Sequence, residues 1–266
     1  MKHVAKKRFG QNFLTDQTVI SSLVNAISPQ PQDLMVEIGP GLGALTKPLM
    51  QTVKLLHVVE LDRDICAWMI KDYAKQYAEQ SIIIHNVDAL KYDFTSLGSN
   101  LRVTGNLPYN ISTPILFYLL GNVVGIKDMH FMLQKEVVER MVAMPSTPEY
   151  GRLSVMLQYY LHMEYLITVP PEAFEPAPKV ESAFVRCVPH AVLPFVAKDT
   201  ALFAKVVMAA FGQRRKTIRN TLKDYLNDDD FADLNLNAQL RAENLSVSDF
   251  VTISNFCTKL LAQAKH

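Results

Sequence analysis

A glycine-rich turn followed by a spaced acid is the part of the sequence best suited to holding a nucleoside. Gly39, Gly41 and Gly43 lie between a short apolar run and a helical stretch. Glycines in such a turn adopt positive φ angles and let a ligand approach the backbone, while the first amides of the following helix face that ligand. Glu60 follows about twenty residues later, where a carboxylate can accept hydrogen bonds from both ribose hydroxyls. The pattern predicts a nucleoside-bearing cofactor, either NAD or S-adenosylmethionine.

Two further acids favour S-adenosylmethionine. Glu37 stands two residues before the first glycine, and the arrangement E-x-G-x-G-x-G resembles the first motif of S-adenosylmethionine methyltransferases, in which the acid faces the cationic methionine end. Asp88 follows the third apolar run, where a carboxylate can meet the adenine amino group. We therefore predict cofactor contacts from Glu37, Gly39, Gly41, Glu60 and Asp88. A plain tight turn, or a helix-capping role for Glu37, is the alternative.

The tetrapeptide Asn106-Leu107-Pro108-Tyr109 closes the fourth apolar run and is the predicted catalytic group. It resembles the Asn-x-Pro-Tyr motif of enzymes that methylate exocyclic amino nitrogens. The N6 lone pair of adenine is delocalised into the ring and is a poor nucleophile. The Asn106 side-chain carbonyl and the Leu107 backbone carbonyl can accept both N6 hydrogens, which draws the nitrogen toward sp³ geometry. Pro108 makes the turn rigid and Tyr109 offers a ring to stack on a flipped-out base. A strand-to-helix turn without chemistry is the alternative.

The histidines and cysteines are expected to take no part in this chemistry. Methyl transfer leaves a cationic nitrogen that loses its proton easily, so no strong base is needed, and we treat His57, His85 and His162 as structural or surface residues. The three cysteines are widely separated and form no C-x-x-C pair, which predicts a reducing cytoplasm and no metal site. No apolar run reaches the roughly eighteen residues of a membrane helix, so no membrane association is expected.

The elements that must position these residues alternate between β-branched runs and helical stretches from Asp33 to about Pro189. Nearly continuous apolar strands separated by helices predict an α/β, Rossmann-like fold with a mostly parallel seven-stranded sheet covered on both faces. A stretch rich in proline precedes the last run, which is predicted to be an added antiparallel strand. The predicted strands are Leu34–Ile38, Leu55–Glu60, Ser81–His85, Leu101–Gly105, His130–Leu133, Tyr165–Val169 and Ser182–Val188, and the predicted helices are Arg63–Ala78 and Thr113–Leu120.

After Pro194 the pattern becomes helical. Asp199–Tyr225 and Val247–Gln263 are predicted helices joined by a polar stretch. We therefore expect a methyltransferase domain over residues 1–195 and a small helical RNA-binding domain over residues 196–266.

The positive charge is concentrated, although the chain carries 27 Lys and Arg against 26 Asp and Glu, a net charge of +1. One basic cluster lies at the start and a second lies in the predicted C-terminal helix, while a later acidic block offsets both in the sum. Such clusters predict contacts with RNA phosphates, with a plain solvated surface as the alternative. The clusters consist of Lys2, Lys6, Lys7 and Arg8, and of Lys205, Arg214, Arg215, Lys216, Arg219 and Lys223. The predicted phosphate contacts are Arg214, Arg215, Lys216 and Arg219.

The chain resembles the rRNA adenine dimethylase family over nearly its whole length, and its small-subunit branch more than its macrolide-resistance branch. Beyond the motifs above, the resemblance rests on four segments. They are Lys7-Arg8-Phe9-Gly10-Gln11-Asn12-Phe13-Leu14, Leu133-Gln134-Lys135-Glu136-Val137, Pro171-x-x-Phe174-x-Pro176-x-Pro178-Lys179-Val180-x-Ser182 and Phe211-Gly212-Gln213-Arg214-Arg215-Lys216.

The resemblance implies dimethylation of N6 of two adjacent adenosines in the 3′-terminal hairpin loop of 16S rRNA, with S-adenosylmethionine as the cofactor. The implied partner is 16S rRNA within the 30S subunit or its precursor, the implied enzyme is a cytoplasmic monomer, and no DNA partner is expected. The resemblance adds Asn12, Leu14 and Asn106 to the cofactor contacts and Phe174 as a second aromatic face for the base. Gly43 stands where some relatives carry alanine, a difference expected to be harmless.

Three other functions stay open on the sequence. They are a non-catalytic ribosome-assembly checkpoint or binding factor, a large-subunit adenine methylase of the macrolide-resistance type, and a NAD-dependent dehydrogenase.

Overall fold

The computed structural model describes residues 12–263 and divides the chain into two compact units. The first unit comprises the described residues up to Val138 together with Met163–Pro189, and the second comprises Glu139–His162 and the described residues from His190 onward. The division therefore differs from the boundary expected near residue 195. Segment 139–162 joins the helical unit because its apolar side chains lie in the same hydrophobic cluster as those of the C-terminal helices.

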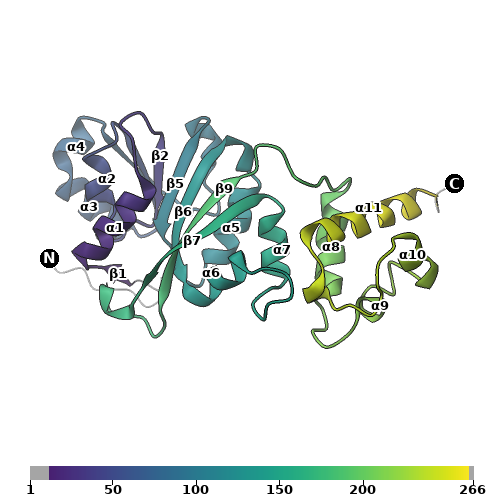
Figure 1. Cartoon of the computed structure of the whole chain (residues 1–266). Coiled ribbons are helices and arrows are strands. Elements are labelled where there is room, and N and C mark those ends of the chain that lie inside the picture. Colours follow the sequence, from purple (N-terminus) through teal and green to yellow (C-terminus); the bar gives the residue numbers. More distant parts are fainter. Residues whose placement is uncertain (1–11, 264–266) are drawn as a thin grey trace. The chain divides into compact units, whose positions relative to one another are not determined.

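The first unit is built on a seven-stranded sheet with helices on both sides (Figure 1). The strand order is β4-β3-β2-β5-β6-β9-β7, the first five strands are parallel, and β9 is antiparallel to β6. This confirms the predicted fold class and the added antiparallel strand. The strands are β2 (Met35–Ile38), β3 (Leu56–Glu60), β4 (Ile82–Asn86), β5 (Leu101–Asn106), β6 (Ile126–Gln134), β7 (Leu161–Val169) and β9 (Ser182–Pro189).

From β2 the chain proceeds outward through β3 to β4, and then crosses back to β5 on the other side of β2, so the strand order reverses between β2 and β5. In open α/β sheets ligands bind outside the carboxyl ends of the strands at this switch point. A second, two-stranded sheet pairs β1 (Phe13–Leu14) with β8 (Phe174–Glu175), so that the N-terminal segment and the proline-rich segment lie side by side.

The first helix of this unit forms because apolar residues recur on one side and an acidic residue caps its start. Asp16 Oδ1 accepts hydrogen bonds from the Thr18 and Val19 amides and so starts the first helix. Leu23 and Ile27 of that helix are buried in one cluster with side chains of β2 and β3. The helices are α1 (Gln17–Ile27), α2 (Thr46–Met50), α3 (Arg63–Asp72), α4 (Ala74–Ala78), α5 (Ser112–Leu120) and α6 (Lys135–Val142), the last of which crosses into the second unit.

One helix of the first unit is interrupted where the sequence predicted continuity over Arg63–Ala78. The helix breaks at Tyr73, whose φ and ψ are −107° and 34°, giving α3 and α4. The side chain of Tyr73 is buried against the glycine turn rather than pointing along the helix surface.

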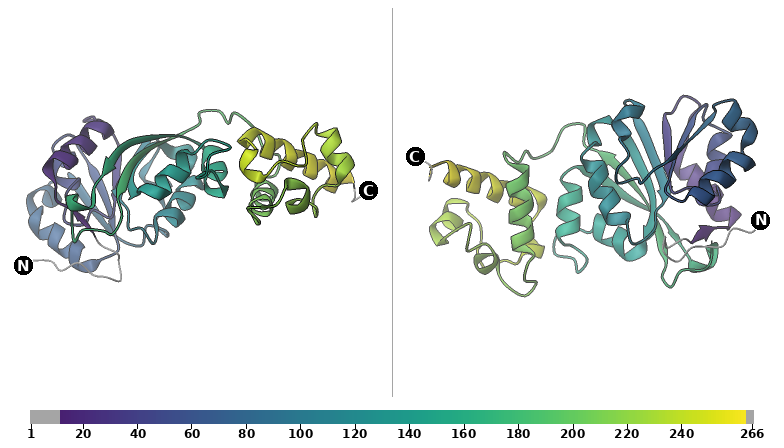
Figure 2. Two further views of the ribbon diagram at one scale, coloured as in Figure 1. Left: turned by 60° about the horizontal axis from the view of Figure 1, so that its bottom comes forward. Right: turned by 180° about the vertical axis from the view of Figure 1, so that it is seen from behind.

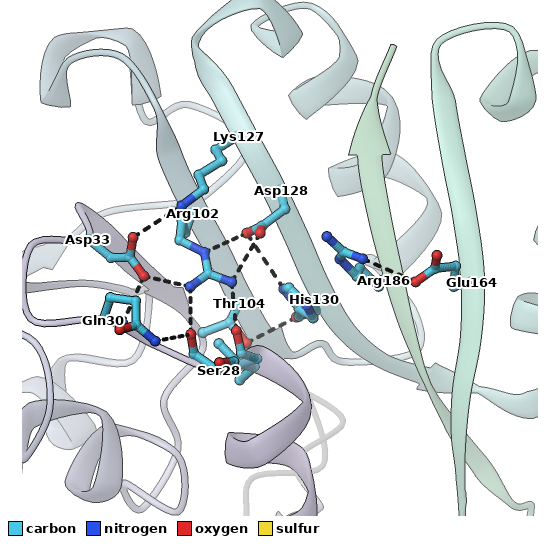
Figure 3. Close-up of polar contacts among 11 residues, drawn as sticks. Ser28, Gln30, Asp33, Arg102, Thr104, Lys127, Asp128, His130, Glu164 and Arg186 are labelled. Carbon is cyan, nitrogen blue, oxygen red and sulfur yellow. Dashed lines mark hydrogen bonds and ion pairs between the residues drawn. The ribbon is translucent and has the colours of Figure 1, made fainter. Parts of the chain in front are cut away.

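The β6 strand is longer than the predicted His130–Leu133 because its charged beginning is buried in an ion-pair network (Figure 3). Arg102 of β5 donates to both carboxylate oxygens of Asp128, at 2.8 and 3.0 Å, and to Asp33 at 2.5 Å. Its remaining donors reach the carbonyls of Ile27 and Ser28 at the end of α1, at 2.6 and 3.3 Å. The network ties α1 to the amino ends of the central strands, at the edge opposite the switch point.

The second unit is helical, as Figure 2 also shows. Its helices are α7 (Arg152–Gln158), α8 (Thr200–Ala210), α9 (Ile218–Thr221), α10 (Asp228–Asp233) and α11 (Val247–Gln263). The prediction for Val247–Gln263 is confirmed, but the continuous helix over Asp199–Tyr225 is wrong. The chain turns after Ala210, where the Gly212 amide donates to the Ala209 carbonyl. Arg215 and Lys216 therefore lie in a turn and not on the predicted helix.

Among residues 12–263, no helix is long and apolar enough to cross a membrane.

Candidate active site

A cavity of about 330 Å³ lies at the carboxyl ends of β2, β3 and β5. It brings together segments that are far apart in the sequence, including every cofactor contact and every catalytic residue that the sequence predicted. The lining residues are 12–14, 37–42, 44–45, 59–61, 65, 87–89 and 106–111.

The glycine turn forms one wall of the cavity and has the predicted backbone. Gly39, Gly41 and Gly43 have φ angles of 65°, 54° and 79°, which disfavour any side chain. A Cβ on Gly41 would lie 2.9 Å from the Phe13 ring. A Cβ on Gly43 would lie 2.2 Å from the Tyr73 hydroxyl, so this chain could take the alanine of some relatives only if the Tyr73 ring moved.

Glu37 is a fully buried acid in the same wall. The Thr46 hydroxyl donates a hydrogen bond of 2.6 Å to Glu37 Oε2. Burial raises the pKa of Glu37 to about 7, with a small further contribution from the negative charge of Glu60 and opposition from the Thr46 hydrogen bond. No basic side chain among the described residues pairs with Glu37. A buried carboxylate without a counter-ion fits a cationic ligand.

Glu60 and Asp88 also line the cavity, Glu60 as the last residue of β3 and Asp88 shortly after β4. Glu60 Oε1 accepts a hydrogen bond of 2.7 Å from the Asp62 amide, and Asp88 Oδ1 accepts one of 3.0 Å from the Leu90 amide. These local bonds orient both carboxylates, which line the cavity at the predicted positions.

Asn106 is held so that its carbonyl is available for a substrate. Its side-chain nitrogen donates a hydrogen bond of 3.1 Å to the Asn12 carbonyl. Because an amide carries its donor and its acceptor on opposite sides, this bond directs Oδ1 away from Asn12. The Leu107 amide donates to the Met132 carbonyl of β6 at 3.2 Å, and the Ile111 amide donates to the Pro108 carbonyl at 3.1 Å. The tetrapeptide is thus fixed by the neighbouring strand and by its own turn.

Tyr109 forms a further part of the cavity wall. Its hydroxyl hydrogen-bonds Ser182 Oγ at 2.7 Å, and its carbonyl accepts a hydrogen bond of 3.1 Å from the Ser112 hydroxyl. Burial raises the pKa of Tyr109, against a smaller opposing effect of Ser182, so the phenol is neutral.

Asn12 and Leu14 line the cavity as predicted, but Phe174 does not. Leu14 pairs with Phe174 between β1 and β8, and the Phe174 side chain is 3% exposed within the core of the first unit. Phe174 therefore anchors the proline-rich segment in this structure. The rest of the predicted N-terminal motif, Lys7–Gln11, and the basic cluster Lys2, Lys6, Lys7 and Arg8 lie outside the described residues.

Comparison with known proteins assigns the family. A model of the family described as ribosomal RNA adenine dimethylase matches residues 2–259. The chain belongs to this family. It is 66% identical to the ribosomal RNA small subunit methyltransferase A of Methylobacillus flagellatus over 96% of this chain and 99% of that protein. It is 54% identical to the protein of the same name from Nitrosospira multiformis, over 98% of this chain and 99% of that protein.

Solved structures show the same fold. A dimethyladenosine transferase from Plasmodium falciparum superposes with a TM-score of 0.77 at 22% identity, covering 95% of this chain and 98% of that chain. The 23S rRNA methyltransferase ErmE superposes with a TM-score of 0.71 at 20% identity, covering 93% and 100%. The dimethylase is therefore a class I methyltransferase in fold, and its cofactor is S-adenosylmethionine.

The predicted phosphate contacts of the dimethylase all lie in the second unit. Arg214, Arg215 and Lys216 are exposed in the turn after α8. Arg219, on α9, forms two hydrogen bonds with the Asp228 carboxylate, at 2.8 and 2.5 Å. Asp228 belongs to the acidic block that balances the basic clusters in the net charge, so an acid of this block pairs directly with Arg219.

No histidine of residues 12–263 lines the cavity. His57 Nδ1 and His85 Nε2 are 3.0 Å apart, and the Tyr92 hydroxyl is 3.2 Å from His85 Nε2. Burial lowers the pKa of both histidines. Within residues 12–263 no three His, Cys, Asp or Glu side chains are grouped so as to hold a metal ion.

Sequence reasoning missed three residues that support the cavity, namely Thr46, Tyr73 and Ser182. Thr46 comes nine residues after the acid it bonds, and Ser182 bonds a residue 73 positions earlier in the chain. Ser182 could have been singled out, because it is the last residue of the proline-rich motif. Neither its spacing nor its residue type indicated that Tyr109 is its partner.

Proposed function

We propose that this dimethylase transfers methyl groups from S-adenosylmethionine to N6 of two adjacent adenosines in the 3′-terminal hairpin loop of 16S rRNA. The observation that carries the proposal is the geometry of Asn106, which lines the cavity and whose Nδ2 is bonded to the Asn12 carbonyl, so that Oδ1 is directed away from Asn12. The names of the two bacterial relatives, small subunit methyltransferases A, support the small subunit as the source of the rRNA.

The residues of the cavity fit the cofactor in charge and shape. Glu37 would hold the cationic methionine end, Glu60 the ribose hydroxyls and Asp88 the adenine amino group, while Gly39 and Gly41 leave room for close approach. When bound, S-adenosylmethionine supplies an electrophilic methyl group. Asn12, Leu14 and Asn106 would complete the contacts from the other side.

The tetrapeptide would activate and orient the target amine. Asn106 Oδ1 and the Leu107 carbonyl accept the two N6 hydrogens, which frees the nitrogen lone pair. Pro108 keeps the turn rigid, and the neutral Tyr109 ring stacks on the flipped-out base. The methylated nitrogen is cationic and releases its proton to water, so no histidine or cysteine is needed in the cavity.

We further propose that residues 196–266 contribute RNA binding through the exposed Arg214, Arg215 and Lys216. Exposed cations can neutralise rRNA phosphates without first breaking an ion pair. Arg219 would contribute less, because Asp228 already pairs with it. The proposed substrate is the 30S subunit or its precursor, and the enzyme acts as a monomer in the cytoplasm.

Two alternatives are disfavoured by particular observations. This chain shares its fold with the 23S rRNA methyltransferase ErmE, but at 20% identity that likeness speaks only for the fold and not for a large-subunit substrate. A purely structural assembly factor needs neither a buried acid without a counter-ion nor a cavity-lining amide whose nitrogen is fixed by a hydrogen bond to the chain. Assembly surveillance alongside catalysis is compatible with both features.

Primer extension distinguishes the two methylation targets, because dimethyladenosine stops reverse transcriptase. Small and large subunits that lack the modification are incubated with the enzyme and S-adenosylmethionine. We expect stops at two adjacent adenosines near the 3′ end of 16S rRNA and none in 23S rRNA. Stops confined to 23S rRNA would overturn the proposed substrate.

A further inference from the structure

Tyr109 is held at both ends by serine hydroxyls. Ser112 Oγ bonds its carbonyl at 3.1 Å, and Ser182 Oγ bonds its phenolic hydroxyl at 2.7 Å. Ser182 is 0% exposed and does not line the cavity. Ser182 therefore reaches the reaction site only through the Tyr109 side chain.

Ser182 itself is fixed by the sheet. It is the first residue of β9 and pairs with Gln134, the last residue of β6. Its neighbour Glu181 accepts the Lys135 amide at 3.0 Å and forms an ion pair of 2.7 Å with the Lys135 ammonium. Because the serine sits on a paired strand rather than on a loop, it offers the phenol a rigid attachment point.

We propose that Ser182 is a positioning residue for the target adenine, which anchors the far end of the Tyr109 ring so that the ring's face receives the base. This rests on the proposed function of the cavity. A tyrosine ring turns about two side-chain torsions. A bond at the hydroxyl fixes the direction of the ring axis, and because a phenolic O–H prefers to lie in the ring plane, the position of its partner also favours one orientation of the ring. Stacking depends on the ring plane, and small displacements near reacting atoms lower the rate strongly.

The same bond assigns the Tyr109 hydroxyl a structural rather than a chemical task. The hydroxyl is directed at β9, and burial raises the pKa of Tyr109, so the phenol keeps its proton. Removing only the hydroxyl should therefore act through ring position and should resemble removing Ser182.

The test is a double-mutant cycle of Ser182→Ala and Tyr109→Phe, measured on small subunits that lack the modification. Either single variant should lower kcat/KM for the subunit by about 2- to 10-fold, the range for one net hydrogen bond. The Kd for S-adenosylmethionine should stay within about twofold of that of the unmodified protein, since Ser182 does not line the cavity. The double variant should be no worse than either single variant. The matched control is Tyr118→Phe, because the Tyr118 hydroxyl bonds the Tyr92 carbonyl at 3.0 Å away from the cavity.

The cycle separates positioning from general destabilisation. If Ser182 supports only the β9 strand, the losses from Ser182→Ala and Tyr109→Phe will multiply, and the proposal is wrong. It is equally wrong if Ser182→Ala matches Tyr118→Phe. Tyr109→Phe leaves the strand intact, so it still tests the idea if Ser182→Ala fails to fold.

A second readout keeps this inference distinct from the proposed function. A hairpin RNA with 2-aminopurine at the target position reports stacking by fluorescence quenching without any methyl transfer. Quenching that the unmodified protein produces and that Ser182→Ala weakens supports the proposal even if no methyl is transferred. Equal quenching by both proteins overturns it.

Discussion

Buried acids have a charged partner near one end of strand β2 and lack one at the other. Before its amino end, Asp33 shares Arg102 with Asp128, and all five Arg102 donors have acceptors. Burial alone would raise the pKa of Asp33, but its hydrogen bonds, above all those from Arg102, hold it below its usual value. At the carboxyl end, Glu37 has one hydroxyl partner and a pKa raised to about 7 by burial. The ion pairs of Arg102 stabilise the fold, whereas the Glu37 carboxyl has no counter-ion and is available to bind a cationic ligand.

The largest predicted effect comes from breaking the paired end. Arg102→Met leaves the buried Asp128 without a counter-ion and Asp33 with only the half-exposed Lys127, 3.3 Å away, which should cost about 3–5 kcal/mol of unfolding free energy. Denaturant titration measures it. The control is Arg186→Met, which removes an ion pair of 3.2 Å between side chains that are 40% and 42% exposed, and should cost less than about 1 kcal/mol (Figure 3). Similar losses in the two variants would contradict the distinction.

At the carboxyl ends of the strands, Asn106→Ala should slow methyl transfer and leave the free energy of unfolding nearly unchanged. Removing an acceptor aimed at the reacting amine should slow methyl transfer by about 100-fold or more, by analogy with single oxyanion-hole donors. RNA binding and the unfolding midpoint should change little. Tyr109→Ala should likewise abolish transfer while RNA binding persists. Normal turnover by Asn106→Ala would refute the proposed mechanism.

The unpaired acid predicts a pH dependence of cofactor binding. With its pKa at about 7, Glu37 is mostly protonated at pH 6 and mostly ionised at pH 8. Affinity for cationic S-adenosylmethionine should therefore rise about tenfold over that range, and Glu37→Gln should bind weakly with little pH dependence. Titration calorimetry at several pH values checks both.

In the ligand-free protein, ionisation of Glu37 has the opposite effect on stability: the free energy of unfolding falls with rising pH, whereas cofactor affinity rises. A carboxyl whose folded pKa is raised binds more protons in the folded than in the unfolded state between its ordinary pKa near 4.5 and about 7. Glu37 therefore lowers stability as pH rises through this window. Relative to the unmodified protein, Glu37→Gln should gain stability from pH 5 to pH 8. A constant difference between the two proteins would contradict the raised pKa.

The smallest predicted effects concern the exposed charges of the second unit. Replacing Arg214, Arg215 and Lys216 by Glu should weaken rRNA binding several-fold. It should also flatten the salt dependence of binding, by about one unit of slope for each phosphate that is no longer neutralised. Arg219→Gln should change affinity by less than about twofold, because Asp228 already neutralises Arg219. Filter-binding titrations at increasing salt measure both, and unchanged affinity of the triple variant would remove this turn from the interface.

The sequence predicted the parts of the molecule that depend on local pattern. The strands β2, β3 and β5 are apolar runs with functional residues at their carboxyl ends, so the cavity could be located before its shape was known. The charged start of β6 was missed because Asp128 is buried only through Arg102, which lies 26 residues away. The break at Tyr73 was missed for the same reason, since the ring turns toward Gly43 in another segment.

The positions of individual side chains could likewise be predicted where they depend on local pattern, and not where they depend on contacts between distant segments. Asn106 and Glu60 line the cavity as predicted, because each is the last residue of a strand whose carboxyl end lies there. The Phe174 prediction did not place the ring correctly, because its burial depends on the pairing of β1 with β8, which local periodicity does not reveal. Contacts between distant segments, such as Tyr109 with Ser182, are likewise set by the fold as a whole.

The proposed reaction is decided by nucleoside analysis after tritiated S-adenosylmethionine has reacted with small subunits that lack the modification. We predict label in N6,N6-dimethyladenosine, approaching four methyl groups per subunit, and almost none with Asn106→Ala at equal folded concentration. Label that stays in monomethyladenosine, appears in another nucleoside or survives in the Asn106 variant would contradict the proposal.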